Sequence, residues 1–146
     1  MKNRLIEFNG VDNTDEYSFK YRVKEKIQGN IEFKNKILTG ATISKKCLNH
    51  KVLDGFEEIN FDKIEIYNNI LIINSKFELS IEYSDNNDFG KLSIYNYNFY
   101  KTFYTSLKDY NSYNLDITIL ITDFNILPLD DEIHYFATLL IGINDL

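Results

Sequence analysis

The sequence predicts a mainly β fold, and three observations support that class. Residues that favour strands, chiefly Ile, Val, Thr, Phe and Tyr, outnumber the strong helix formers, and Ala occurs only at positions 41 and 137. Apolar side chains recur at every second position in several segments, which is the period of a half-buried strand. A run rich in Asn and Asp separates two of these segments as a turn would. We therefore expect one domain over residues 1–146, an antiparallel β-sandwich or strongly curved sheet of about eight strands, with α+β as the alternative class.

The strands of the first half are expected from short apolar segments. Residues 4–8 predict a strand near the N-terminus, and residues 17–24 predict another, because aromatic and aliphatic side chains alternate there with polar ones. Residues 31–33 and 37–43 predict two further strands. Residues 64–73 predict one or two more.

A hairpin is expected in the middle of the chain. Residues 77–83 alternate between apolar and polar side chains, residues 84–90 have the composition of a turn, and Leu92 and Ile94 restart the alternation. Beyond Ile94 the apolar phase moves by one position to Tyr95. A slip of one residue predicts a β-bulge at this point.

Residues 100–110 favour a helix, because four apolar residues in and just before this range fall three or four positions apart. They are Phe99, Phe103, Leu107 and Tyr110. Residues 54–58 predict one further helical turn. The last two strands are expected at residues 115–123 and 133–143, where the apolar pattern returns.

The charges of the chain are unevenly distributed along the sequence. The net charge is −6, but residues 20–51 contain nine Lys and Arg against two Glu, a balance of +7. Residues 109–146 contain seven Asp and Glu and no Lys or Arg, a balance of −7. Either the two segments pair across a sheet, or the acidic segment faces outward and attracts a basic partner. The net negative charge argues against nucleic-acid binding as the main task.

Several features concern the compartment. Cys47 is the only cysteine and cannot form an internal disulfide. The N-terminal residues lack the apolar core of a signal peptide. The apolar stretches at 70–73 and 136–143 are far shorter than the roughly 20 residues of a membrane-spanning helix. We expect a cytoplasmic protein without a membrane partner.

Few residues carry the marks of catalysis or metal binding. Cys47 and His50 have the spacing of half a zinc site, but the other half is missing, since His134 is the only other histidine. Residues 130–134 collect three carboxylates and His134, a set that suits acid–base chemistry but is also typical of a solvated loop. The chain has no phosphate-binding loop, dinucleotide fingerprint or nucleophile elbow. We expect no enzyme activity, no metal and no cofactor.

The densest pattern is aromatic, and it gives the candidate binding site. Eight Tyr and Phe lie between residues 95 and 113, and a helix there would turn Tyr100 and Tyr104 away from the core. Tyrosine beside carboxylate is typical of interfaces. The candidate partner-binding residues are Tyr100, Tyr104, Asp109, Tyr113, Asp116, Asp130, Asp131 and Glu132.

A small acidic chain without catalytic motifs resembles bacterial immunity proteins, which neutralise toxin domains, and small phage-encoded inhibitors of host defence. This resemblance implies a stoichiometric inhibitor that binds a basic toxin or effector domain. Because the resemblance rests on size, charge and the absence of catalytic motifs, it assigns no functional role to any particular residue. The alternatives are a β-sandwich module that binds carbohydrate or associates with itself, and a small enzyme built on His134.

Overall fold

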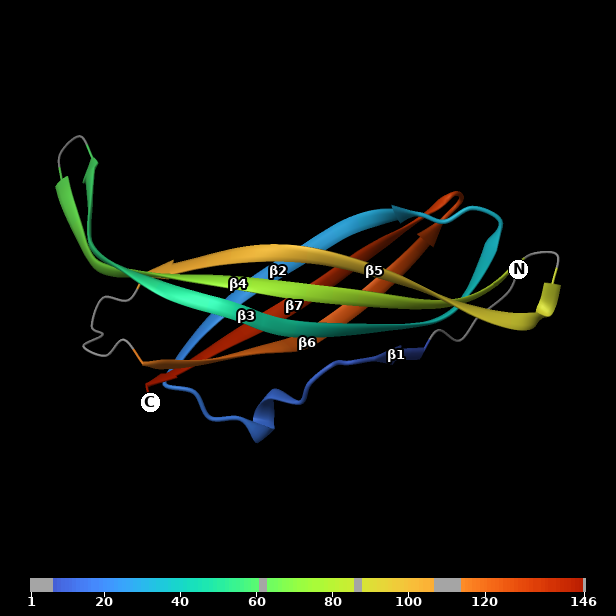
Figure 1. Ribbon diagram of the computed structural model, residues 1–146, viewed down its shortest axis with the longest axis horizontal. Coiled ribbons are helices and arrows are strands. Elements are labelled where there is room, and N and C mark those ends of the chain that lie inside the picture. The colour runs from blue at the N-terminus through green and yellow to red at the C-terminus, as the bar shows by residue number, and fades with distance from the viewer. Residues whose placement is uncertain (1–6, 61–62, 86–87, 107–113, 146) are drawn as a thin grey trace.

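The computed structural model describes residues 7–60, 63–85, 88–106 and 114–145 (Figure 1). Within these ranges the chain forms strands almost throughout, together with one short 3-10 turn, η1 (Thr14–Glu16). This confirms the mainly β class. The strands are β1 (Glu7–Asn9), β2 (Tyr21–Glu32), β3 (Lys36–Asn60), β4 (Lys63–Asp85), β5 (Asp88–Ser106), β6 (Leu115–Leu129) and β7 (Glu132–Asp145).

The strands form two sheets that pack face to face as a sandwich. The first sheet has the order β1-β3-β4-β5 and the second has the order β2-β7-β6. All pairings are antiparallel except that of β1 with β3. Figure 1 shows the long strands of the first sheet crossing those of the second at an angle, as twisted sheets do. The expected antiparallel sandwich is confirmed.

The core lies between the two sheets and follows from the two-residue period. On β4 every second residue from Leu71 to Ile81 is buried, and on β7 every second residue from Ile133 to Ile143 is buried. Aromatic rings join the layers in the middle. Phe77 stacks on Phe99 with ring centroids 5.3 Å apart, and Phe99 lies 5.2 Å from the Tyr135 ring of the opposite sheet.

Tyr135 also covers a glycine within its own sheet. Gly29 on β2 pairs with Tyr135, and a Cβ at Gly29 would lie 2.3 Å from the Tyr135 hydroxyl oxygen. The ring therefore occupies the space that a side chain at position 29 would need. Burial, with a contribution from the nearby Tyr97, raises the pKa of Tyr135.

Residues 10–20, which we call the strap, connect β1 of the first sheet to β2 of the second. The strap leaves β1 at Gly10, whose φ of +87° and close approach to the Ile43 carbonyl both require glycine. It runs along the β6 side of the sandwich (Figure 1). Near its end the Phe19 ring covers Gly142 on the outer face of β7.

The helix expected at residues 100–110 is wrong, because β5 continues as a strand to Ser106; residues 107–110 lie outside the described residues. Phe99 and Phe103 face the core from this strand. A spacing of four residues places two side chains on one face in a helix and in a strand alike. The helical turn expected at 54–58 is also wrong, because β3 extends unbroken to Asn60.

Other boundaries are corrected as well. No register shift occurs between β4 and β5 from Leu92 to Ser106, so the expected bulge beyond Ile94 is absent there. Leu92 and Ile94 lie on the outer face instead, 60% and 67% exposed. The strand expected at 17–24 begins only at Tyr21 and continues through 31–32, so two expected strands are one. The segments 64–73 and 77–83 likewise form the single strand β4.

No helix in the described ranges is long and apolar enough to cross a membrane.

Candidate functional site

The outer face of the four-stranded sheet carries a surface that we call the lysine–tyrosine face. Three neighbouring strands each contribute three side chains that point away from the core. They are Lys46, Asn49 and Lys51 of β3, Ile72, Asn74 and Lys76 of β4, and Tyr100, Thr102 and Tyr104 of β5.

Strand register arranges these nine residues in three rows. Lys46, Lys76 and Tyr100 pair directly across the strands, and so do Lys51, Ile72 and Tyr104. A bulge between Cys47 and Asn49 shifts the alternation of β3 by one residue. Asn49 and Lys51 therefore point to the same face as Lys46. Lys46 and Lys51 therefore lie on one side of the face, Lys76 lies in the middle, and the tyrosines lie on the other side.

The middle row fixes the geometry of the face. The Asn74 side-chain nitrogen donates to the Asn49 side-chain oxygen at 2.7 Å, and the Thr102 hydroxyl donates to the Asn74 side-chain oxygen at 2.9 Å. This ladder crosses all three strands and holds the outward side chains in one orientation. Tyr100 and Tyr104 stand on either side of it, about 13 Å apart along the strand at the usual rise per residue.

The charged and aromatic groups of the face are available to a partner. Tyr100 and Tyr104 are 66% and 64% exposed, the largest exposures among the described tyrosines. Lys46, Lys51 and Lys76 take part in no ion pair among the described residues. Farther along the same face the residues turn polar and acidic, with Ser80 donating to Asn96 at 2.7 Å and Thr39 donating to Glu82 at 3.3 Å.

The structure does not bring the sequence-predicted site residues together. Tyr100 and Tyr104 lie on the lysine–tyrosine face, whereas Asp116 is exposed on β6 of the other sheet. Asp130 and Asp131 form the turn between β6 and β7. Asp109 and Tyr113 lie outside the described residues.

Glu132, the last of the predicted site residues, is held by two neighbours. Its carboxylate accepts from the Asn30 side-chain nitrogen at 3.0 Å and lies 2.9 Å from His134 Nε2. The hydrogen bond to His134, followed by that from Asn30, lowers the pKa of Glu132. Asn30 lies on β2, and Glu132 and His134 lie on the adjoining strand β7. Their contacts therefore link two neighbouring strands at the surface of the sheet.

The other candidates for chemistry stay isolated. The Cys47 thiol is half-buried, burial raises its pKa, and its nearest recorded acceptor is the Asn49 carbonyl at 3.9 Å. A raised pKa disfavours the reactive thiolate. The described part of the chain holds no group of three or more His, Cys, Asp and Glu placed to bind a metal ion.

The oppositely charged segments meet only in part. β2 of the basic segment pairs along its length with β7 of the acidic segment, and Lys20 Nζ forms an ion pair with Asp145 at 2.6 Å. Arg22, Lys24 and Lys26 project from β2 on the outer face and take part in none of the ion pairs recorded for the described residues.

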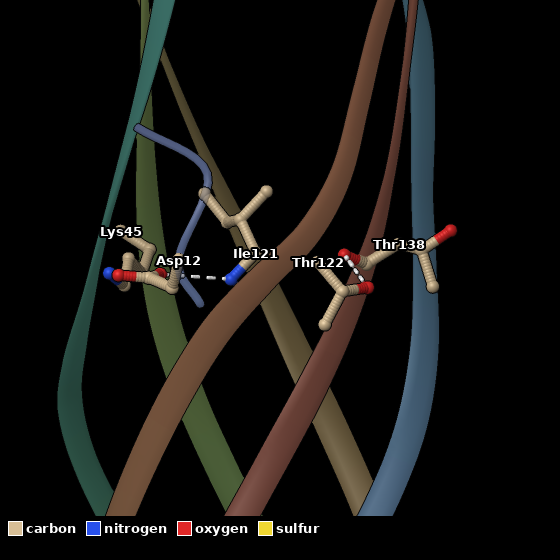
Figure 2. A network of polar contacts seen from close by, with 5 residues as sticks. All are labelled: Asp12, Lys45, Ile121, Thr122 and Thr138. Atoms are coloured by element: carbon tan, nitrogen blue, oxygen red, sulfur yellow. Dashed lines mark hydrogen bonds and ion pairs between the residues drawn. The ribbon is translucent and has the colours of Figure 1, made fainter. Parts of the chain in front are cut away.

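Sequence reasoning missed the anchor of the strap, which Figure 2 shows. Asp12 accepts from Lys45 Nζ at 2.7 Å and from the Ile121 backbone N–H at 3.1 Å, while its own N–H donates to the Ile121 carbonyl at 2.8 Å. Asp12 thereby joins the strap to β3 of one sheet and β6 of the other. Its partners lie 33 and 109 residues away, and no local pattern indicates such pairings.

Comparison with known proteins gives no relative: no family model matches the chain, and no curated protein or solved structure matches it either.

Proposed function

We propose that this protein is a stoichiometric protein-binding inhibitor that uses the lysine–tyrosine face to contact its target. The observation that carries the proposal is that Tyr100 and Tyr104 stand exposed beside three lysines that have no ion-pair partner among the described residues. Tyrosine offers a large contact area at low entropic cost, and a hydrogen-bonded sheet supports it without rearrangement.

The charge of the face specifies the chemistry of the target surface. The nine residues of the face include three lysines and no acidic residue, and the first carboxylate beyond them on β4 is that of Glu78, two residues after Lys76. A complementary target therefore presents carboxylates between apolar groups that receive the tyrosine rings. The basic toxin or effector domain expected from the sequence would instead have to contact the separate acidic groups near Asp116 or the turn at Asp130 and Asp131.

A protein target is favoured over nucleic acid. Tyrosines flanked by lysines also occur on sheets that bind single-stranded nucleic acid. However, the chain carries a net charge of −6, and the acidic residues elsewhere on its surface would repel a phosphate backbone that extends past the face. An acidic protein patch of limited size avoids this repulsion.

The proposal is tested by affinity capture with matched variants as bait. Nuclease-treated lysate of the source organism is passed over the wild type, the Tyr100→Ser/Tyr104→Ser variant, Lys46→Glu and Lys26→Glu. Lys26→Glu makes the same charge change on the other sheet. We expect one acidic-surfaced protein held at one-to-one stoichiometry by the wild type and Lys26→Glu, and lost by the other two variants.

An Asp130→Lys/Asp131→Lys bait distinguishes an acidic target that binds the lysine–tyrosine face from a basic target that binds the acidic turn. If this bait alone loses the target, binding belongs to the acidic turn and the proposal for the lysine–tyrosine face is wrong. A target retained by every bait, or one captured only from a parallel lysate without nuclease treatment, would also contradict it.

Carbohydrate binding is a second candidate, favoured by the amide and hydroxyl groups between the two tyrosines. Sugars bind to aromatic rings flanked by such groups. The Asn74 amide donates to Asn49 and accepts from the Thr102 hydroxyl, which leaves the Thr102 oxygen as an acceptor and the remaining amide hydrogens as donors for a ligand. Screening the wild type and the Tyr100→Ser/Tyr104→Ser variant against a glycan array decides this: a glycan bound by the wild type alone would support it.

A further inference from the structure

A groove on the outer face of the three-stranded sheet lies between the strap and β2. It is open to solvent and has a volume of about 550 Å³, within the range of small-molecule sites. The strap contributes one wall through Thr14, and β2, β6 and β7 contribute the rest. Its lining residues are Thr14, Arg22, Lys24, Thr122, Thr138, Leu139 and Leu140.

The polar groups of the groove favour an anion. Arg22 and Lys24 are two residues apart on one face of β2, about 7 Å along the strand, so both side chains reach the same group. No acidic residue lines the groove. Asp12 is paired with Lys45 and Asp145 with Lys20, and the exposed Asp15 and Glu16, which follow Thr14 on the strap, form no ion pair with Arg22 or Lys24 among the described residues. The charges of Arg22 and Lys24 are therefore available to a ligand.

The floor of the groove adds hydroxyl groups and an apolar contact. Thr122 and Thr138 lie on the neighbouring strands β6 and β7, where the Thr122 hydroxyl donates to the Thr138 carbonyl at 3.2 Å (Figure 2). Leu140 projects from the same outer face and is 7% exposed, so it adds a small apolar patch beside the methyl groups of Thr122 and Thr138. A ligand with a small apolar body would bury that body against this part of the floor.

The strap that forms the wall is fixed at both ends. Asp12 ties its beginning to β6 and β3. At its end, Asn144 donates to the Ser18 carbonyl at 3.1 Å and accepts from the Lys20 N–H at 2.8 Å. The groove is thus preformed, and a ligand pays little ordering entropy on entering it.

We propose that this groove binds a small organic anion, whose carboxylate or phosphate group lies between Arg22 and Lys24 and whose apolar body rests on the floor formed by Thr122, Thr138 and Leu140. Arg gives bidentate contact to either kind of oxyanion, and Lys adds a second charge. This site lies on the opposite sheet from the lysine–tyrosine face and does not depend on the protein-binding proposal.

The test is a nuclear magnetic resonance titration of the full chain labelled with ¹⁵N. The probes are phenyl phosphate, benzoate, inorganic phosphate and, as the neutral control, benzyl alcohol. We expect phenyl phosphate or benzoate to shift the backbone amide signals of Arg22, Lys24 and Thr138, more tightly than inorganic phosphate, while benzyl alcohol leaves them unmoved. Which of the two aryl anions binds better identifies the oxyanion.

Charge variants make the result specific. Arg22→Gln/Lys24→Gln should weaken binding by about tenfold or more, the loss expected for removing charge-assisted hydrogen bonds. Lys26→Gln, on the same strand and face but outside the groove, should weaken binding clearly less than the double variant, because it removes no direct contact to the anion. Amide signals that respond to none of the anions, or equal weakening in both variants, would overturn the proposal.

Discussion

Asp12 is the residue on which the attachment of the strap depends. Its half-buried carboxylate accepts from Lys45 and from the Ile121 N–H. Asp12→Ala leaves that N–H and a half-buried ammonium without their acceptor, so we expect a loss of about 1–3 kcal/mol in the free energy of unfolding. Asp12→Asn keeps one acceptor oxygen and should lose less. Urea denaturation of the three proteins measures both differences.

Asp15 provides the control for this comparison. It is exposed, and its recorded hydrogen bond uses only its backbone N–H, which donates to Asn13 at 3.1 Å. Asp15→Ala should therefore change the free energy of unfolding by less than about 0.5 kcal/mol. Equal effects of Asp12→Ala and Asp15→Ala would show that the carboxylate of Asp12 does not anchor the strap.

Glu132 makes a pH-dependent contribution to stability whose sign follows from its pKa. Hydrogen bonds from His134 and Asn30 lower the pKa of this carboxyl from its usual value of 4.5 in the folded state. A lowered folded-state pKa stabilises the protein above the unfolded-state pKa, and the effect is lost as the pH falls through the folded-state value. The wild type should exceed Glu132→Gln in urea midpoint at pH 6, with the difference shrinking below about pH 4.5. A difference that stays constant between pH 6 and pH 3 would contradict this assignment.

At the scale of the element, the strap is coupled to β7 through Phe19. A Cβ at Gly142 would lie 2.3 Å from the Phe19 ring, so Gly142→Ala should displace that ring and cost about 1–3 kcal/mol. In a Phe19→Ala background the space is open, and the same substitution should cost less. A double-mutant cycle by chemical denaturation measures this coupling, expected at about 0.5–3 kcal/mol. Additive effects would show that Phe19 does not cover Gly142.

The strands could largely be predicted from sequence, and the errors have two physical origins. Alternation located β4 and β7 because a core on one side and solvent on the other impose a period of two. The segment after Phe99 was ambiguous, because residues four apart share a face in both kinds of element. Leu92 and Ile94 give the wrong buried face for the start of β5, because both are aliphatic and yet exposed.

At the scale of the whole molecule, the candidate sites could be predicted only in part. The exposure of Tyr100 and Tyr104 was expected, although from a helix, and the strand places them outward for a different reason. Their neighbours Lys46, Lys51 and Lys76 come from two other strands, so the surface exists only through register. The groove depends in the same way on the strap crossing a sheet built from distant segments. Local sequence patterns do not show which distant segments of the chain lie side by side.

Substitutions on the inner face of the four-stranded sheet should lower the free energy of unfolding much more than substitutions on its outer face. This difference shows whether an outer-face variant loses its partner through a lost contact or through unfolding. Phe77 is fully buried between Phe99 and Phe103, so Phe77→Ala should cost about 3–5 kcal/mol in the free energy of unfolding. Tyr100→Ser and Lys46→Glu remove side chains that solvent surrounds, and each should cost less than about 1 kcal/mol. Thermal and urea unfolding of the three variants gives the comparison. If the outer-face variants were as unstable as Phe77→Ala, the lysine–tyrosine face would serve the fold, and loss of a partner by those variants would no longer indicate an interface.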